Sequence, residues 1–232
     1  MKKTIFTLAI GDYPKEITDL TFPWITRYAR KIGADFRVIS DRKFPKWGIT
    51  YEKHQIHKLG AKNDWNLFVD ADALIHPDLM DLTAICPRDT VLFTGKDMSA
   101  MRFKPDEFFL RDGRYIGACS WFVLSSDWTH DLWQPLDDLA PEEAYARIFP
   151  TQMERMSVGI TAPKLIEDYS LSRNIARFGL KHATIEGAGG LKEKFGRQTD
   201  AYYWHQYTIG IDEKILQLGN VLKAWGMEGG PK

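Results

Sequence analysis

Over about its first 75 residues the chain alternates between two hydrophobic patterns, and this alternation limits its fold more than any other feature. Three short apolar runs have the length of buried strands, at 4–10, 36–39 and 66–69. Between them, apolar residues recur at helical spacing over 17–32, and the segment 51–61 is also predicted to be a helix. Strands that alternate with helices predict βαβ units and a parallel sheet. In such a sheet a ligand lies beyond the carboxyl ends of the strands.

The rest of the chain is less regular but adds elements of both kinds. Strands are predicted at 90–94 and 115–125, and helices at 142–149, 167–178 and 213–225. The strand at 115–125 is long enough to join a mixed sheet. Gly33 predicts the end of the first helix, and Pro23 inside that helix predicts a kink or a restart. No repeat or linker is visible, and the glycine-rich stretch 187–190 indicates only a loop.

These elements predict one α/β domain over residues 1–232. Its fold class is Rossmann-like, with a mixed, mainly parallel central sheet flanked by helices.

The composition argues against several classes of protein. Lys plus Arg and Asp plus Glu number 31 each, so the overall charge indicates neither nucleic acid nor an anionic membrane as partner. The two cysteines, Cys86 and Cys119, are too few for a disulfide scaffold. The apolar N-terminal run is short and charged residues follow it at once, which indicates a strand rather than a signal peptide. No apolar segment approaches the ~20 residues that span a bilayer. We therefore predict a cytoplasmic protein without a membrane span.

Two carboxylates follow the third strand, in the sequence Asp70-Ala71-Asp72. Because they lie two residues apart just beyond a strand end, both side chains are expected to project from a short turn into the crevice. Side by side they repel each other, which favours a hard divalent cation between them. Such an ion stabilises the diphosphate leaving group of a nucleotide sugar. The alternative is that Asp70 and Asp72 are loop acids that cap the following turn.

Several short segments of the chain are weak signals one by one, but together their order indicates a family. They are Lys53-His54-Gln55-Ile56, then Phe68-Val69-Asp70-Ala71-Asp72-Ala73-Leu74-Ile75, then Ile116-Gly117-Ala118-Cys119-Ser120-Trp121-Phe122-Val123, then Glu167-Asp168 before Leu171, and finally Trp204-His205-Gln206-Tyr207-Thr208-Ile209-Gly210 followed by Lys214. With these motifs the chain resembles glycosyltransferase family 8, the glycogenin-like retaining enzymes, over most of its length. The opening Gly11-Asp12-Tyr13 and the stretch 28–36 look closer to galactosyl- and mannosyltransferase relatives.

The resemblance implies a GT-A fold and a reaction. The reaction would transfer a hexose from a nucleotide sugar, expected to be a UDP-sugar, with retention at the anomeric carbon. Glu167 and Asp168 would be the catalytic residues at the reacting face of the sugar, and the alternative is that they only favour the start of a helix. The acceptor is left open between a saccharide, a lipid, a protein side chain and a modified nucleobase. The sequence indicates no oligomeric state.

The resemblance also implies residues that bind the donor. Those expected to contact the nucleotide sugar are Ile10, Gly11, Asp12, Tyr13, Lys53, Asp70, Ala71 and Lys214. The implied metal ligands are Asp70, Asp72 and His205. An imidazole beside two carboxylates favours Mn²⁺ over Mg²⁺, whereas without them His205 would be a core histidine. For His54 and His57, which share a helical face, a structural role is expected rather than a metal pair.

Two other classes of function compete with a transferase. Asp-x-Asp after an apolar strand also resembles the signature of haloacid dehalogenase-type phosphatases, whose first Asp is a nucleophile. That signature normally opens the chain and carries Thr or Val after the second Asp, whereas here the motif lies mid-chain and Ala73 follows it. The other alternative is a protein that binds a nucleotide sugar without turning it over.

Overall fold

The computed structural model describes residues 1–94, 103, 119–150, 152, 155–156, 159–185, 202–205 and 209–227. The strands are β1 (Lys3–Leu8), β2 (Ala34–Ile39), β3 (Trp65–Val69), β4 (Leu74–Ile75), β5 (Thr90–Thr94), β6 (Cys119–Ser126), β7 (Lys181–Thr184) and β8 (Tyr203–Trp204). The α-helices are α1 (Lys15–Ile32), α2 (Ile56–Leu59), α4 (Pro141–Tyr145), α6 (Ile166–Arg177) and α8 (Ile211–Ala224). Short 3₁₀ helices are η1 (Ile49–Gln55), η2 (Leu82–Ala84), η3 (Asp127–Trp133) and η4 (Ala162–Lys164).

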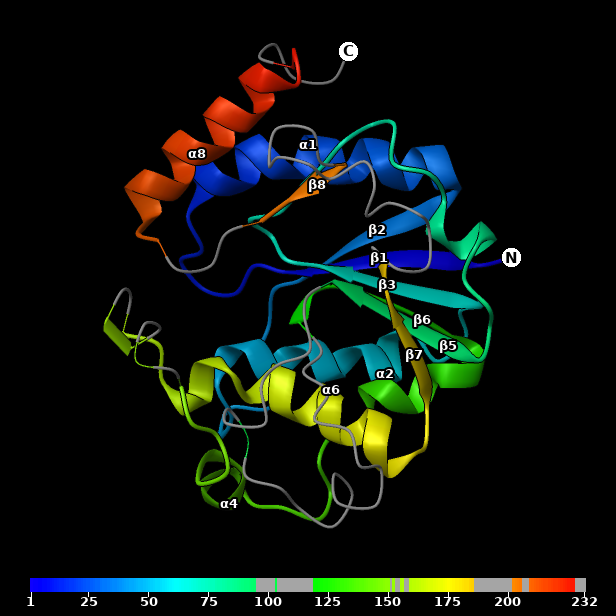
Figure 1. Cartoon of the computed structure of the whole chain (residues 1–232), viewed down its shortest axis with the longest axis vertical. Coiled ribbons are helices and arrows are strands. Elements are labelled where there is room, and N and C mark those ends of the chain that lie inside the picture. The colour runs from blue at the N-terminus through cyan, green and yellow to red at the C-terminus, as the bar shows by residue number, and fades with distance from the viewer. Residues whose placement is uncertain are drawn as a thin grey trace.

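A six-stranded sheet in the order β2-β1-β3-β6-β5-β7 forms the centre of the molecule (Figure 1). β1 is parallel to β2 and β3, and β5 is parallel to β7. β6 is antiparallel to both of its neighbours, β3 and β5. A second, two-stranded sheet pairs β4 with β8. The predicted fold class, a mixed and mainly parallel sheet flanked by helices, is confirmed.

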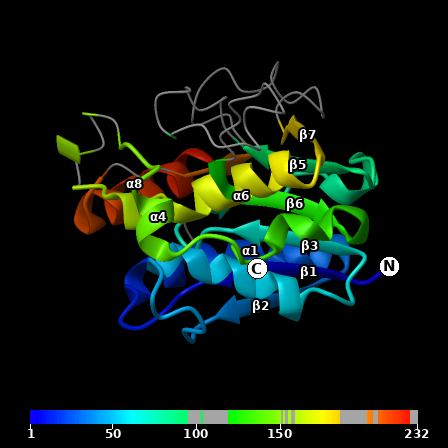
Figure 2. The same ribbon diagram turned by 90° about the horizontal axis from the view of Figure 1, so that it is seen from below.

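Helices cover both faces of the sheet, and the strands alternate their side chains between them. α1 and α8 lie above the sheet in Figure 1, whereas η1, α2 and α6 lie below it. Figure 2 views the molecule from the side of α6, which packs on β6. In β3, Leu67 and Val69 join the apolar cluster of Tyr28 from α1, while Phe68 joins that of Leu171 from α6. β3 is therefore buried on both faces, as its continuous apolar sequence predicts.

Three predicted helices differ from the structure in their bounds or continuity. α1 runs through Pro23 as one helix without a restart, and it ends at Gly33, whose φ of 66° is left-handed. The segment predicted as a helix at 51–61 is η1 followed by the one-turn α2. Every residue of 51–56 is buried, so packing on all sides replaces the single apolar stripe of an ordinary helix. The helix predicted at 142–149 ends at Tyr145, and beyond it Ile148 forms a β-bridge with Phe103.

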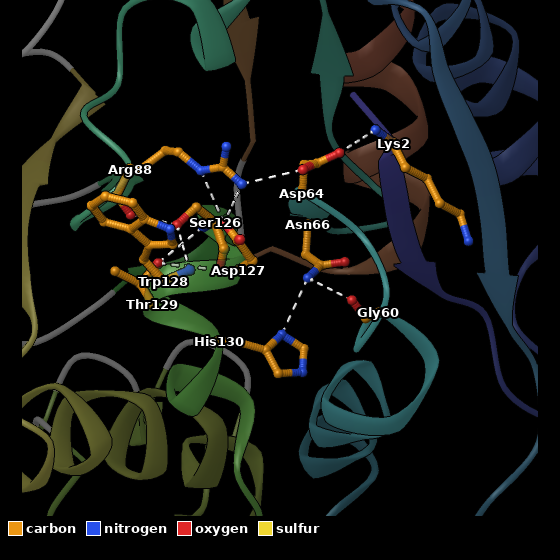
Figure 3. A network of polar contacts seen from close by, with 10 residues as sticks. All are labelled: Lys2, Gly60, Asp64, Asn66, Arg88, Ser126, Asp127, Trp128, Thr129 and His130. Carbon is orange, nitrogen blue, oxygen red and sulfur yellow. Dashed lines mark hydrogen bonds and ion pairs between the residues drawn. The ribbon is translucent and has the colours of Figure 1, made fainter.

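Polar contacts fasten the edge of the sheet at which β3 begins and the antiparallel β6 ends (Figure 3). The Arg88 guanidinium donates to Asp64 at 3.2 Å and to Asp127 at 2.7 Å. The buried Asn66 amide donates to the Gly60 carbonyl oxygen at 3.2 Å and lies 3.3 Å from Nδ1 of His130. These contacts join the N-terminal end of β3 to the elements around it, at the end of the strand opposite to the Asp-x-Asp turn.

Three predicted features lie wholly or partly outside the described residues. They are the first part of the strand at 115–125, the loop at 187–190 and residues 206–208 of the His205 segment. Among the residues that the structure describes, no helix has both the length and the hydropathy needed to cross a membrane.

Candidate metal centre

The two carboxylates lie where the sequence predicts them, in a tight turn beyond the carboxyl end of β3. The Asp70 amide donates to the Trp121 carbonyl oxygen of β6 at 2.8 Å, and the Ala73 amide donates back to the Asp70 carbonyl oxygen at 3.0 Å. Below the turn, the Thr21 hydroxyl of α1 lies 2.5 Å from the carbonyl oxygen of the buried Ala71. The backbone between the two aspartates is therefore held from both β6 and α1.

His205 reaches this turn through the second sheet. β4 begins two residues after Asp72, and its Leu74 pairs with Trp204 of β8 in antiparallel register. The next residue, His205, therefore lies beside the turn that carries the carboxylates. Its imidazole stacks on the indole of Trp121, with ring centroids 4.8 Å apart and planes 20° from parallel. This stack fixes the plane of the ring.

One oxygen of each aspartate faces the imidazole. Nε2 of His205 lies 3.7 Å from Oδ2 of Asp70 and 3.2 Å from Oδ1 of Asp72. The three candidate ligand atoms lie within 4.8 Å of one another, close enough to share an ion. The structure thus brings together all three predicted metal ligands. Two carboxylate oxygens and one imidazole nitrogen form a donor set that fits Mn²⁺.

The other oxygen of each aspartate contacts a lysine. Nζ of Lys53, from η1, lies 3.0 Å from Oδ1 of Asp70, and its side chain is 2% exposed. Nζ of Lys214, from α8, contacts Oδ2 of Asp72. Lys53 also lies 3.5 Å from Oε1 of Glu167 and 4.4 Å from the centroid of the Phe68 ring. The predicted donor residue Lys53 is thus a buried counter-ion of two acidic side chains, and its predicted contact with the nucleotide stays a prediction.

The charges around the turn shift the pKa values of its acidic groups. Burial acts to raise the pKa of Asp72, but His205 and Lys214 outweigh it and hold that pKa well below its usual range. Burial, with the charges of Asp72 and Asp70, raises the pKa of the Tyr13 hydroxyl. Asp72 is therefore ionised, and Tyr13 is protonated, at neutral pH.

The predicted catalytic pair lies on the α6 side of the turn. Glu167 and Asp168 are both buried in the first turn of α6. Burial raises the pKa of Glu167 to about 7, although the nearby Lys53 ammonium acts against this. Lys53 connects Glu167 to Asp70, so the acidic pair and the candidate metal ligands share one ionic network.

The remaining residues singled out in the sequence lie beyond the end of β1 or beside Lys53. Gly11 has a left-handed φ of 64°, and it is exposed together with Asp12 beyond the end of β1. Ile10 is half-buried there. The His54 ring is buried, with Nδ1 at 2.9 Å from the Trp133 carbonyl oxygen and Nε2 at 2.6 Å from the Ser170 hydroxyl. His54 thus has the structural role expected of it, because it ties η1 to η3 and α6 beside Lys53.

The sequence does not predict two contacts of the site. They are the stack of Trp121 on His205 and the hydrogen bond from the Thr21 hydroxyl to the Ala71 carbonyl oxygen. Both contacts join segments far apart in the chain, so no local spacing could have indicated them.

No family model matches the sequence, and no curated protein matches it. Among solved structures, a glycosyltransferase involved in the glycosylation of the major capsid of PBCV-1 matches with a TM-score of 0.57 and 13% identity, over 95% of this chain and 100% of that one. The chain has the GT-A fold.

Two further structures match with lower scores. The catalytic domain of Drosophila beta1,4-galactosyltransferase 7, in complex with xylobiose, has a TM-score of 0.43 and 12% identity, over 79% of this chain and 64% of that one. A mutant of the same enzyme in complex with manganese, UDP-Gal and xylobiose has a TM-score of 0.38 and 14% identity, over 79% and 65% of the two chains.

Proposed function

We propose that this chain is a metal-dependent glycosyltransferase that transfers a hexose from a UDP-sugar to an acceptor. The observation that carries the proposal is the convergence of Oδ2 of Asp70, Oδ1 of Asp72 and Nε2 of His205 at the carboxyl edge of the sheet. The GT-A fold supports it, because ligands of such sheets lie at that edge.

The metal ligands and the neighbouring cations would act on the leaving group. Asp70, Asp72 and His205 would hold a Mn²⁺ ion, which when bound supplies positive charge to the departing diphosphate. Lys214 reaches the same place from the first turn of α8 and would donate to a phosphate oxygen. Ile10, Gly11, Asp12 and Tyr13 would contact the base and ribose, since they follow the end of β1 at the same edge.

Glu167 and Asp168 are proposed to act on the sugar. Glu167 lies 3.5 Å from Nζ of Lys53, which in turn contacts Asp70. A carboxylate there would stabilise positive charge on the anomeric carbon or attack it as a nucleophile, and either role is compatible with retention. The expected product has the anomeric configuration of the donor, which NMR of the early product measures. An inverted product would reject retention while leaving the transferase intact.

The proposal is tested by ligand-induced stabilisation. UDP should raise the melting temperature of the protein much more with Mn²⁺ than with a chelator, because binding to the native state stabilises it. UDP-hexoses supplied with Mn²⁺ should release UDP. Equal shifts with and without Mn²⁺ would remove the metal from the proposal. Hydrolysis of p-nitrophenyl phosphate would instead favour the phosphatase, and binding without UDP release would favour a non-catalytic binder.

A further inference from the structure

Each aspartate of the metal centre divides its two oxygens between a lysine and the histidine. Asp70 offers Oδ1 to Lys53 at 3.0 Å and Oδ2 toward His205 at 3.7 Å. Asp72 offers Oδ2 to Lys214 and Oδ1 toward His205 at 3.2 Å. The two lysines come from opposite layers of the molecule, since Lys53 lies in η1 and Lys214 in α8. The three atoms that face one another are those that would bind a cation.

This arrangement has a consequence for charge. An Asp-x-Asp turn without neighbours carries two negative charges, which attract a divalent cation strongly. Here an ammonium group faces each aspartate, although Lys53 is shared with the buried Glu167, and both lysine side chains are largely removed from solvent, at 2% and 12% exposed. Screening by water and salt is therefore weak. A divalent cation placed between Oδ2 of Asp70 and Oδ1 of Asp72 is repelled by both lysines at short range.

We propose that Lys53 and Lys214 make the binding of the divalent cation depend on a bound diphosphate. This inference rests on the proposed function, because it takes the ligand to be a nucleoside diphosphate. A cation added to this turn is repelled by both ammonium groups, and the negative charges of a diphosphate offset that repulsion. Cation and diphosphate therefore bind tightly together and weakly apart. By linkage, each raises the affinity of the other by the same factor.

Lys214 is the residue on which to test this. Its side chain extends from the first turn of α8, and Lys214→Met keeps most of the length of the side chain while removing its charge. A dication and an ammonium a few ångströms apart repel each other by enough to change affinity about tenfold, even in a dielectric close to that of water. Lys214→Met should therefore bind Mn²⁺ alone about tenfold more tightly than the unchanged protein.

The experiment measures free Mn²⁺ by its electron paramagnetic resonance signal, with and without UDP, after subtraction of the Mn²⁺ that UDP binds in protein-free solution. In the unchanged protein UDP should tighten Mn²⁺ binding about tenfold or more, and in Lys214→Met this factor should shrink. The matched control is Lys181→Met, which removes an exposed lysine paired with Asp89 at the start of β7, at the other edge of the sheet. It should leave both affinities unchanged.

A second variant tests the buried lysine independently. Lys53→Met alone would strand the buried Glu167, so it is combined with Glu167→Gln, and circular dichroism checks the fold. Because Glu167→Gln itself removes an acidic group, the reference is Glu167→Gln alone, and relative to it the pair should bind Mn²⁺ more tightly in the absence of UDP.

The outcomes separate the two proposals. If Mn²⁺ binding in Lys214→Met without UDP is unchanged or weaker while UDP still tightens it in the unchanged protein, the inference is wrong and the metal-dependent transferase stands. Tight Mn²⁺ binding by the unchanged protein that UDP does not improve also overturns the inference alone. If the unchanged protein takes up no Mn²⁺ with or without UDP, both proposals are wrong.

Discussion

Replacement of Asp72 by asparagine should destabilise the protein even without metal. Two adjacent carboxylates would repel each other in isolation, so from the sequence alone Asp72→Asn would be expected to relieve strain. In the structure, however, Asp72 contacts the ammonium of Lys214 and the imidazole of His205. These two groups outweigh burial and hold the pKa of Asp72 low, which means that the folded state favours its negative charge.

The magnitude follows from how much of the contact is shielded from solvent. The side chains of Asp72 and Lys214 are only 13% and 12% exposed. Charge-assisted hydrogen bonds contribute about 1.5–3 kcal/mol, and the Asn amide oxygen, which has no charge, keeps a weaker contact with the Lys214 ammonium. Relief of the repulsion from Asp70 offsets part of the loss. We expect the free energy of unfolding to fall by about 2 kcal/mol, which corresponds to roughly 4–8 °C in a chain of this size.

The assay is urea unfolding in the presence of a chelator, followed by circular dichroism. The matched control is Asp19→Asn, which removes the same charge from the exposed pair with Lys15 and should cost about 0.5 kcal/mol or less. Mn²⁺ with UDP should stabilise the unchanged protein and Asp19→Asn alike, and it should barely stabilise Asp72→Asn. Stability of Asp72→Asn equal to or above that of the unchanged protein, with the chelator present, would refute the ion-pair reasoning.

Three other perturbations test the site and its support. His205→Ala removes the nitrogen donor, so Mn²⁺ with UDP should raise its melting temperature less than that of the unchanged protein, and an equal rise would exclude His205 as a ligand. Burial lowers the pKa of His54 to about 4, whereas the pKa in the unfolded state is about 6.5. The contribution of the neutral ring to the free energy of unfolding should therefore be complete above pH 6.5 and fall by about 3 kcal/mol as the pH drops toward 4. Urea titrations should find this loss absent in His54→Gln. In Gly60→Ala the new Cβ would lie 2.2 Å from Oδ1 of the buried Asn66. The free energy of unfolding should therefore fall by about 1–3 kcal/mol while Mn²⁺ binding is unchanged. A melting temperature equal to that of the unchanged protein would contradict this packing.

Local patterns in the sequence predict the parts of the fold that are held together by neighbours in the chain. The apolar run before Asp70 and the helical spacing of 17–32 are such patterns, and both β3 and α1 occur as expected. Periodicity does not reveal that Pro23 is tolerated within α1, because a helix packed along its length can lose one hydrogen bond and persist. It also does not reveal η1, where burial on every side removes the amphipathic stripe.

The candidate site was predicted as a set of residues but not as a set of contacts. Asp70 and Asp72 follow from the position of the strand end, whereas His205 and Lys214 were joined to them by resemblance to a family. Lys214 contacts Asp72 across 142 positions of sequence, a distance that no spacing rule bridges. The partnership of Lys53 with Asp70 and Glu167 likewise depends on how η1 and α6 pack against the end of β3.

One apolar cluster positions both groups that face Asp72. It joins Ile17 and Trp24 of α1, Leu74 of β4, Trp204 of β8, and Leu218, Val221 and Leu222 of α8. Leu74 and Trp204 are a paired position of the ladder that brings His205 to the turn, and Leu218 lies one helical turn after Lys214 on α8. The imidazole and the ammonium are therefore fixed by the same packing. A cavity in this cluster should loosen the two contacts of Asp72 together, while the contact of Lys53 with Asp70, held by a different layer, persists.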